Sequence, residues 1–574
     1  MPSNFPIFAC FVGDYPEQVL VSGCKTGDCP KCPTKNAELG QLKENYEYRD
    51  LEKVLDALKT FDTNPANYPA VCAEAGIKPI AHPFWESLPH SDIYLAITPD
   101  VLHQLYQGVM KHLISWVIDA FGQKEIDARS KCLPPNHNIQ MFSKGISSFS
   151  HLTEKEHADI CRVLLGLVVD LKLPDGRSPL SLIWCIHSLL DFLYLAQYPL
   201  HTSETLHLQQ QSLERFHEDK EIFVDLNIRE NFNLPKLHSL AHYVESIQLF
   251  GTTDNYNTEY TERLHIDLAK DAYRATNHQD EYGQMTVWLQ RKETVLQHQS
   301  YLEWRAGIQS ATTLQPLSMG SWGALSLTKW PTVKAVDLND IKKDYGATFL
   351  YEALRRYIVL LKHTGPPLTK AQLERQIPYT DIPFKSVSVY HKLKFTSVAS
   401  SGPSKLHTLD AIHVRPKKLS RQKALIPARF DTVLLNIKDG GTETRLQGMS
   451  LLLFYFYEAN QYKDHQVGQV RVIFSLPEYT NERLAYIEWF TAFAAPDPNH
   501  GMLKVNHMFL NAKDCVASIV PISLIRCSVH LFPKFGLKVP EDWTSENVLE
   551  KCNTFYLNQF SDRNMYYITQ KSYS

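Results

Sequence analysis

One glutamate of this chain lies where a carboxylate needs a partner. Glu262 is in the stretch NYNTEYTERLHIDLAKDAYRATNHQDE (Asn255–Glu281), whose apolar residues recur at helical spacing. On that helix Glu262 falls beside Ile266, on the flank of the apolar surface. Glu259 instead shares the polar face with Arg263, which can neutralise it at i, i+4. By itself the stretch favours an amphipathic helix with one semi-buried glutamate bonded to a neighbour, and a metal ion at Glu262 is the alternative. Between the two acids, Glu262 is the better candidate ligand.

A second acid, Asp14, follows an apolar run near the start of the sequence. PIFACFVG (residues 6–13) predicts a buried strand that closes at Gly13, and residues 19–22 predict another short strand. Sheet proteins of the RNase H type place metal-binding carboxylates at the end of such a strand. The alternative is a turn residue ahead of Pro16.

Three cysteines cluster on a loop rich in Gly, Asp and Pro, and thiolates on such a loop hold zinc. A redox CxxC is the competing interpretation, but no βαβ context supports it. Asp100 and His103, at i and i+3 in the first turn of a predicted helix, offer further ligands. The predicted structural zinc ligands are Cys29, Cys32 and His103, with Cys24 or Asp100 as the fourth. The alternative is a reduced CxxC loop with Asp100 as a helix cap.

Two histidines, His238 and His242, share a helix face at i, i+4. No acid lies between them in an HExxH pattern, which disfavours protease chemistry. We interpret both as core or DNA-facing residues, with metal ligation as the alternative.

A basic tract, HVRPKKLSRQKALIPAR, lies late in the chain. Such a tract can contact phosphates, with an affinity that falls as salt rises, although a solvated linker explains it equally well. The candidate DNA-binding residues are Arg415, Lys417, Lys418, Arg421 and Lys423.

Composition sets broad limits on the function. The chain has 574 residues and a formal net charge of −3, so any DNA contact must come from local patches. Eleven cysteines in no regular framework favour a reducing compartment. No apolar run reaches the roughly 18 residues needed to span a bilayer, so we expect a soluble intracellular protein without a membrane partner.

The segment pattern predicts an α+β multi-domain chain. Asp14 and Glu262 are 248 positions apart in the sequence, which leaves room for a large helical insertion. Branched and alternating runs after Pro383 predict a C-terminal all-β domain that resembles a barrel. The predicted segments are 1–38 (strands and zinc loop), 39–235 (helical insertion), 236–300 (last helical part of the core), 301–380 (linker and helix) and 381–574 (β-rich).

Five motifs together resemble the fungal Plavaka transposases, DDE enzymes related to the CACTA and Kyakuja-Dileera-Zisupton elements. They are FVGDYPEQ (Phe11–Gln18), CPKC (Cys29–Cys32), TPDVLHQLYQG (Thr98–Gly108), PKLHSLAHY (Pro235–Tyr243) and NTEYTERLH (Asn257–His265). The resemblance implies cut-and-paste transposition in the nucleus, with DNA ends as substrate, Mg²⁺ or Mn²⁺ at the catalytic acids, and association between copies of the chain. It identifies Asp14 as the second catalytic acid and Glu262, with Glu259 as competitor, as the last. It also pairs a CxxC with a D/C-x2-H motif.

The resemblance also implies a missing part. The family's first catalytic Asp belongs to a strand upstream, whereas this sequence begins at Met1, just ahead of the strand predicted near Pro6. We therefore expect an incomplete RNase H-like core and an N-terminally truncated, inactive remnant of a transposase, because two-metal chemistry needs bridging carboxylates. The alternative is a non-catalytic DNA- or protein-binding module derived from a transposase.

Overall fold

The computed structural model describes residues 7–147, 153–174, 176–306, 323–366, 368–398, 406–420, 422–436, 465–476, 479–511 and 514–571. The chain forms two compact units. Unit 1 comprises Met1–Ala120, Leu152–Ala158 and Trp184–Gln315, and unit 2 comprises Phe121–His151, Asp159–Ile183 and Pro316–Ser574. The α+β class predicted from the sequence is confirmed.

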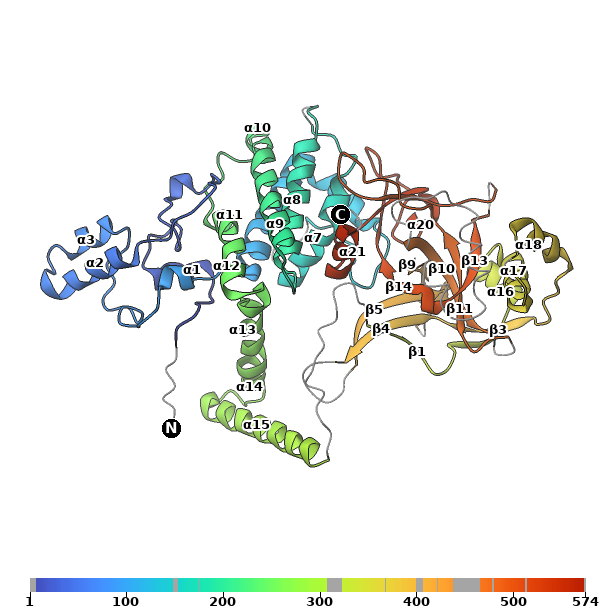
Figure 1. Ribbon diagram of the computed structural model, residues 1–574. Helices are drawn as coiled ribbons and strands as arrows, with labels where there is room; N and C mark the ends of the chain where they lie inside the picture. The colour runs from blue at the N-terminus through green and yellow to red at the C-terminus, as the bar shows by residue number, and fades with distance from the viewer. Residues whose placement is uncertain are drawn as a thin grey trace. The chain divides into compact units, whose positions relative to one another are not determined.

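Unit 1 is built from helices. Its first part contains α1 (Tyr15–Ser22), α2 (Leu51–Thr63), α3 (Tyr68–Glu74), α4 (Ile93–Ala96), η2 (Val101–Met110) and most of α5 (Lys111–Phe121). Its later part contains most of α8 (Leu180–Ala196), then α9 (Ser203–Asp219), α10 (Ile222–Asp225), α11 (Pro235–His238), η3 (Ser239–His242) and α12 (Tyr243–Phe250). It ends with α13 (Thr258–His265), η5 (Ile266–Lys270), α14 (Asp271–Arg274) and α15 (Glu281–Arg305). Figure 1 shows α12, α13 and α14 following one another, with α15 turning off at their end.

The N-terminal segment differs from the sequence-based prediction. Residues 15–22 form helix α1, so the strand predicted for residues 19–22 is wrong. Asp14 caps this helix, since its side chain accepts from Glu17 N at 3.0 Å while the Glu17 carboxylate accepts from Asp14 N at 3.2 Å. Of the predicted strand at residues 6–13, the described residues form one parallel bridge, between Phe11 and Ile97. The RNase H-like core therefore stays a prediction.

Two long helices lie in segments that were predicted to contain helix. In the segment 39–235, the apolar stretch around Cys185 forms α8, whose residues 182–190 are almost all buried because it is apolar on nearly every side. In the segment 301–380, α17 (Leu350–Lys362) buries one face, including Leu354 and Ile358.

Unit 2 contains three main antiparallel sheets. The largest has the order β13-β11-β10-β3-β2, with β9 bridging β10 and β14. Its strands are β2 (Val333–Asp337), β3 (Ser386–Tyr390), β9 (Thr432–Asn436), β10 (His465–Ser475), β11 (Arg483–Trp489), β13 (Ala517–Pro521) and β14 (Ile525–Val529). The second sheet pairs β1 (Ala324–Leu327), β4 (Lys392–Val398), β5 (Leu406–Arg415) and β8 (Arg429–Phe430). The third pairs β12 (Lys504–Asn506), β16 (Thr554–Leu557) and β15 (Leu531–Pro533).

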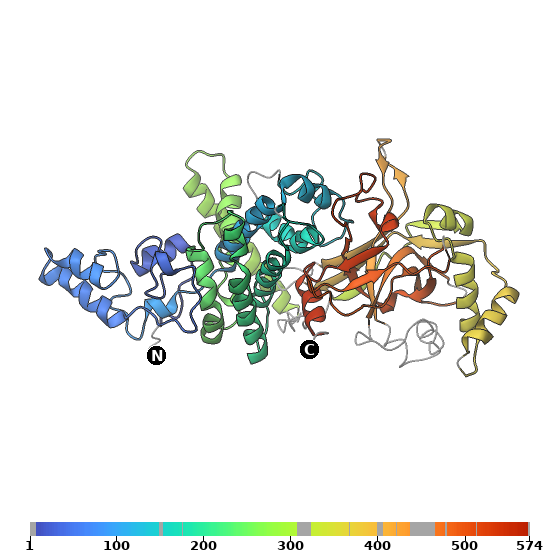
Figure 2. The same ribbon diagram turned by 90° about the horizontal axis from the view of Figure 1, so that it is seen from above.

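The C-terminal part is not an all-β barrel. Over its described strands none of these sheets closes on itself, and two helices, α20 (Val548–Lys551) and α21 (Arg563–Lys571), lie within residues 381–574. Helices α16 (Leu338–Asp344), α17 and α18 (Lys370–Gln376), from the segment predicted as linker and helix, belong to the same unit. Helix α17 packs against β13, and Figure 2 shows α17 and α18, in yellow, together at that side of the sheet. Residues 437–464, within the segment predicted as β-rich, lie outside the described residues.

One large apolar core organises unit 2, and it includes Val472, Ile487 and Phe555. Burial of this surface is the main stabilising contribution to the unit. No helix among the described residues is long and apolar enough to cross a membrane.

Candidate metal centre

The loop after α1 holds two buried thiols. Cys29 and Cys32 are 3% and 1% exposed. The side chain of Arg49 fixes the loop by donating to the carbonyl of Cys29 from Nε (3.1 Å) and Nη2 (2.8 Å). Lys31, also buried, donates from Nζ to the carbonyl of Leu95 at 3.3 Å, which ties the loop to α4. These contacts hold the thiols with little freedom to move away.

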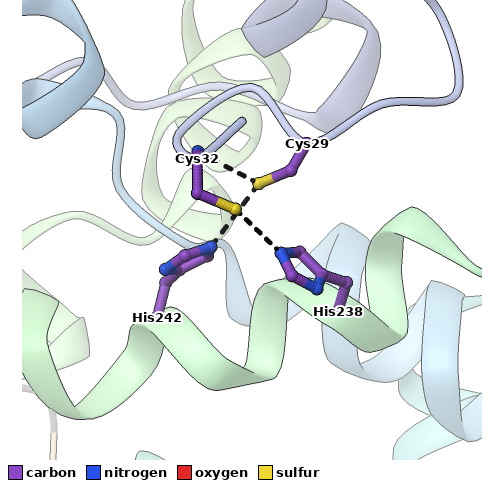
Figure 3. Close-up of side chains that lie close together, drawn as sticks. All are labelled: Cys29, Cys32, His238 and His242. Atoms are coloured by element: carbon purple, nitrogen blue, oxygen red, sulfur yellow. Dashed lines mark hydrogen bonds between the residues drawn. The ribbon is translucent and has the colours of Figure 1, made fainter. Parts of the chain in front are cut away.

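Two buried histidines face these thiols from the segment α11–η3. Sγ of Cys32 lies 3.2 Å from Nε2 of His238, and Sγ of Cys29 lies 3.5 Å from Nε2 of His242 (Figure 3). The ring of Tyr46 packs edge-on against both imidazoles, at centroid distances of 5.1 and 5.4 Å. All four ligand atoms lie within 4.8 Å of one another.

This Cys2His2 set fits zinc. A tetrahedral zinc with bonds of about 2.0–2.3 Å places its ligand atoms roughly 3.3–3.8 Å apart, close to the sulfur–nitrogen distances found here. The hydrogen bond from Cys29 and those from the two histidines hold the pKa of the Cys32 thiol far below its usual range, against the effect of burial. Burial lowers the pKa of His242, so its imidazole stays neutral, as a ligand must be. Burial raises the pKa of Cys29, and a bound cation would remove that proton.

The structure therefore assembles a different set from the one inferred from the sequence. Cys29 and Cys32 come together with His238 and His242, and not with Cys24, Asp100 or His103. Cys24 is buried and forms a β-bridge with Ile77. The two histidines, interpreted above as core or DNA-facing, are the missing half of the group.

His103 is engaged elsewhere, between two carboxylates. Its Nδ1 lies 2.7 Å from Asp100 Oδ2, and its Nε2 lies 3.0 Å from Glu262 Oε1. The hydrogen bond to Asp100 raises the pKa of His103 despite burial, and the charges of Glu262 and Asp14 raise it further. The imidazole is thereby favoured as a cation between its partners.

Asp100 has several donors of its own. Its carboxylate caps η2 by accepting from the backbone N–H of His103 at 2.8 Å and also accepts from the hydroxyl of Thr258 at 2.7 Å. Burial alone would raise the pKa of Asp100, but the bonds from His103 and Thr258 outweigh it and lower the pKa. Through Thr258, the first residue of α13, Asp100 fixes the helix that carries Glu262.

The catalytic acids inferred from the resemblance are found in the surroundings of Asp100 and His103. Glu262 is half-exposed on α13 and pairs with His103. Glu259 accepts from the side chain of its capping neighbour Asn257 at 3.2 Å. Asp14 caps α1 and lies within electrostatic range of His103. Among the described residues these acids do not form a group with the mutual distances of metal ligands.

The basic tract belongs to unit 2. Lys417, Lys418 and Lys423 are exposed around the hairpin of β6 (Lys418–Leu419) and β7 (Leu425–Ile426), and Arg415 is half-buried at the end of β5. Arg421 lies outside the described residues.

The sequence held a signal for the true partners of the thiols. A CxxC followed by H-x3-H is a zinc pattern, but its halves are usually near each other, whereas 206 residues separate Cys32 from His238. Because of this wide separation, the sequence did not indicate that these histidines lie beside the cysteines.

Comparison with known proteins agrees with the motifs. No curated protein and no solved structure matches the chain. The model of the Plavaka transposase family matches residues 2–117, which include the cysteine loop, Asp14 and the Asp100–His103 pair. Residues 2–117 are thus similar to the Plavaka transposase domain, and this match covers about a fifth of the chain.

Proposed function

We propose that this chain is a transposase-derived DNA-binding protein, held in shape by a structural zinc ion and unable by itself to cleave a phosphodiester. The observation that carries the proposal is the Cys2His2 group, in which Cys29 and Cys32 meet His238 and His242. This group joins the family domain to the segment just before α13. The helix bearing Glu262 is thereby placed against Asp100 and His103.

Zinc in this centre would be structural. Four protein ligands leave no open position for water or substrate, which is the feature of structural rather than catalytic zinc. Cys29 and Cys32 would bind as thiolates, and His238 and His242 as neutral imidazoles through Nε2. The zinc supplies folding free energy, and the chemistry of any DNA contact belongs to other side chains.

We infer the lack of cleavage from the contacts that Asp14 and Glu262 make. In the intact family, Mg²⁺ or Mn²⁺ held by the catalytic carboxylates activates the attacking oxygen. Here Asp14 completes a capping box and Glu262 is neutralised by His103. Neither is part of a group of metal-ligating side chains among the described residues. A metal at Glu262 would first have to displace the imidazole.

The test separates binding from cleavage. Purified protein is mixed with a fluorescent 30-base-pair duplex to measure binding by anisotropy, and with supercoiled plasmid plus Mg²⁺ or Mn²⁺ to measure nicking. We expect binding without nicking. Metal-dependent nicking would refute the inactive assignment, and its loss in Glu262→Gln or in Glu259→Gln would then identify which of the two glutamates is the last catalytic acid.

A protein-binding module derived from the same ancestor is the second candidate. It is favoured by α15, in which Tyr282 and Trp304 are 77% and 75% exposed. Absence of duplex binding at about 50 mM salt, where phosphate contacts are strongest, would refute the DNA-binding function and leave this candidate. Nuclear location and association between copies remain parts of the proposal that follow from the family.

A further inference from the structure

Three cations of unit 1 gather around one histidine. His112 lies at the start of α5, and burial lowers its pKa, followed by the charges of Arg229, Lys236 and Lys111. All three charges lower the pKa of His112. Lys111, Arg229 and Lys236 form no ion pair with any described carboxylate. The three cations therefore form a positive surface beside His112, which attracts anions.

Packing holds two of the three in place. The guanidinium of Arg229 lies over the ring of Trp116, 5.4 Å from its centroid, and His112 stacks on the same ring at 5.9 Å. Trp116 is itself 4% exposed. Arg229 also donates to the carbonyl of Asn231 at 3.2 Å, which leaves other N–H groups of the guanidinium for a ligand.

Lys236 is positioned by a glycine. A Cβ added at Gly108 would meet Cδ of Lys236 at 2.6 Å and its Cβ at 3.3 Å, so the lysine stem lies directly on the bare backbone of η2. Helix α11 packs against η2 along this contact. The side chain of Lys236 is half-buried, so part of it is open to solvent or a ligand.

The same lysine connects the positive surface with the acids. Its stem lies on Gly108 of η2, and the same helix carries His103 in its first turn and is capped by Asp100. The positive surface therefore continues along η2 towards these two residues. A polyanion lying on Lys111 and Arg229 would pass Lys236 and arrive beside Asp100, His103 and Glu262.

We infer that Lys111, Arg229 and Lys236 form a basic surface that binds the phosphodiester backbone of DNA and leads it to the Asp100–His103–Glu262 group. This inference rests on the proposed DNA-binding function and adds the residues that carry it. Contacts of this kind fix the position of the duplex and do not read its sequence. The basic surface is distinct from the tract around Lys417 and Lys418, which belongs to unit 2.

The experiment compares two triple variants with equal changes of charge. The first is Lys111→Gln, Arg229→Gln and Lys236→Gln. The control is Lys35→Gln, Lys53→Gln and Lys59→Gln, three exposed lysines of unit 1 far from η2 in sequence. Binding to the 30-base-pair duplex is measured by anisotropy from about 50 to about 200 mM salt, and bound zinc and circular dichroism confirm that each protein is folded.

We expect the first variant to lose affinity roughly tenfold or more and the control to keep it. The slope of log affinity against log salt should become shallower by up to about 2.7, since each phosphate contact contributes about 0.9. Equal loss in both variants, or loss in neither while the wild type binds, would overturn the inference and leave the proposed function standing. If the wild type itself does not bind, the proposed function fails instead.

Two single variants examine the packing. Gly108→Ala should push the stem of Lys236 aside and weaken binding; because the added Cβ also meets the backbone oxygen of His103 at 2.8 Å, circular dichroism checks that the helical content is unchanged. Lys236→Arg keeps the charge and should retain most of the affinity. A variant of the other basic tract, Lys417→Gln with Lys418→Gln and Lys423→Gln, tests the competing DNA-binding residues directly. Loss of binding in that variant alone would place the duplex on unit 2 and refute the basic surface.

Discussion

At the scale of single residues, the metal centre gives the clearest test. Cys29→Ser or His242→Ala should abolish the one equivalent of zinc, because each removes a ligand from a closed tetrahedral set. Cys24→Ser and His103→Ala should keep it. The metal content is measured by mass spectrometry after exhaustive dialysis. Zinc lost from Cys24→Ser but retained in His242→Ala would restore the ligand set inferred from the sequence alone.

A second residue couples stability to pH. His530 is 1% exposed in unit 2, and its Nδ1 accepts from Nδ2 of Asn558 at 3.1 Å. Burial lowers the pKa of His530 to about 3, so the folded state keeps it neutral while the unfolded state binds a proton below about pH 6.5. The stabilisation is therefore present above pH 6.5 and is lost as the pH falls from there towards 3.

We expect this histidine alone to cost the fold about 2 kcal/mol between pH 6.5 and pH 5. Urea denaturation at both pH values measures the change. In His530→Gln, which keeps an acceptor for Asn558 but cannot titrate, that part of the loss should vanish. An unchanged pH dependence in the variant would show that other groups dominate.

At the scale of elements, variants of Asp14 distinguish a helix-capping role from a metal-binding role. Its carboxylate accepts the backbone N–H of Glu17 at the start of α1. Asp14→Ala should destabilise unit 1 by about 1 kcal/mol, whereas Asp14→Asn should be nearly neutral because asparagine caps equally well. Urea denaturation compares the two variants. If asparagine is as harmful as alanine, the negative charge itself is needed, which would support a metal-binding role.

The same helix shows how far the sequence could be interpreted. The motif D-x-x-E at Asp14–Glu17 is a capping-box pattern with Pro16 in the first turn, and it predicts a helix. The apolar run before it favoured strands instead. Long elements such as α8 and α17 were predictable because periodicity over more than ten residues is a strong local signal.

The partners of the thiols were not predictable in the same way. The spacing of Cys29 and Cys32 indicates a metal site. Which histidines reach them depends on the path of the chain between α1 and α11. Asp100 and His103 have ligand spacing as well, yet the fold uses them to hold Thr258 and Glu262. The local sequence pattern indicates which residues are able to bind a metal, and tertiary packing decides which of them come together.

At the scale of the whole molecule, the two units should respond differently to a chelator. All four metal ligands belong to unit 1, and the apolar core of unit 2 contains none of them. Structural zinc contributes of order 10 kcal/mol to small zinc-dependent folds. Calorimetry with a strong chelator should therefore lower one unfolding transition and leave a second one in place. A single transition that shifts as a whole would contradict this expectation.

The span of the metal centre also has a consequence for biosynthesis. Because 213 residues separate Cys29 from His242, the ribosome must release nearly half of the chain before the last imidazole is available. Until then the nascent N-terminal thiols have only partial coordination and stay open to oxidation or to competing metals. A message cut short before the codon for His238 would yield a polypeptide with both sulfur donors and neither nitrogen donor. Zinc could not stabilise the fold of such a product, and cellular quality control would decide whether it is degraded.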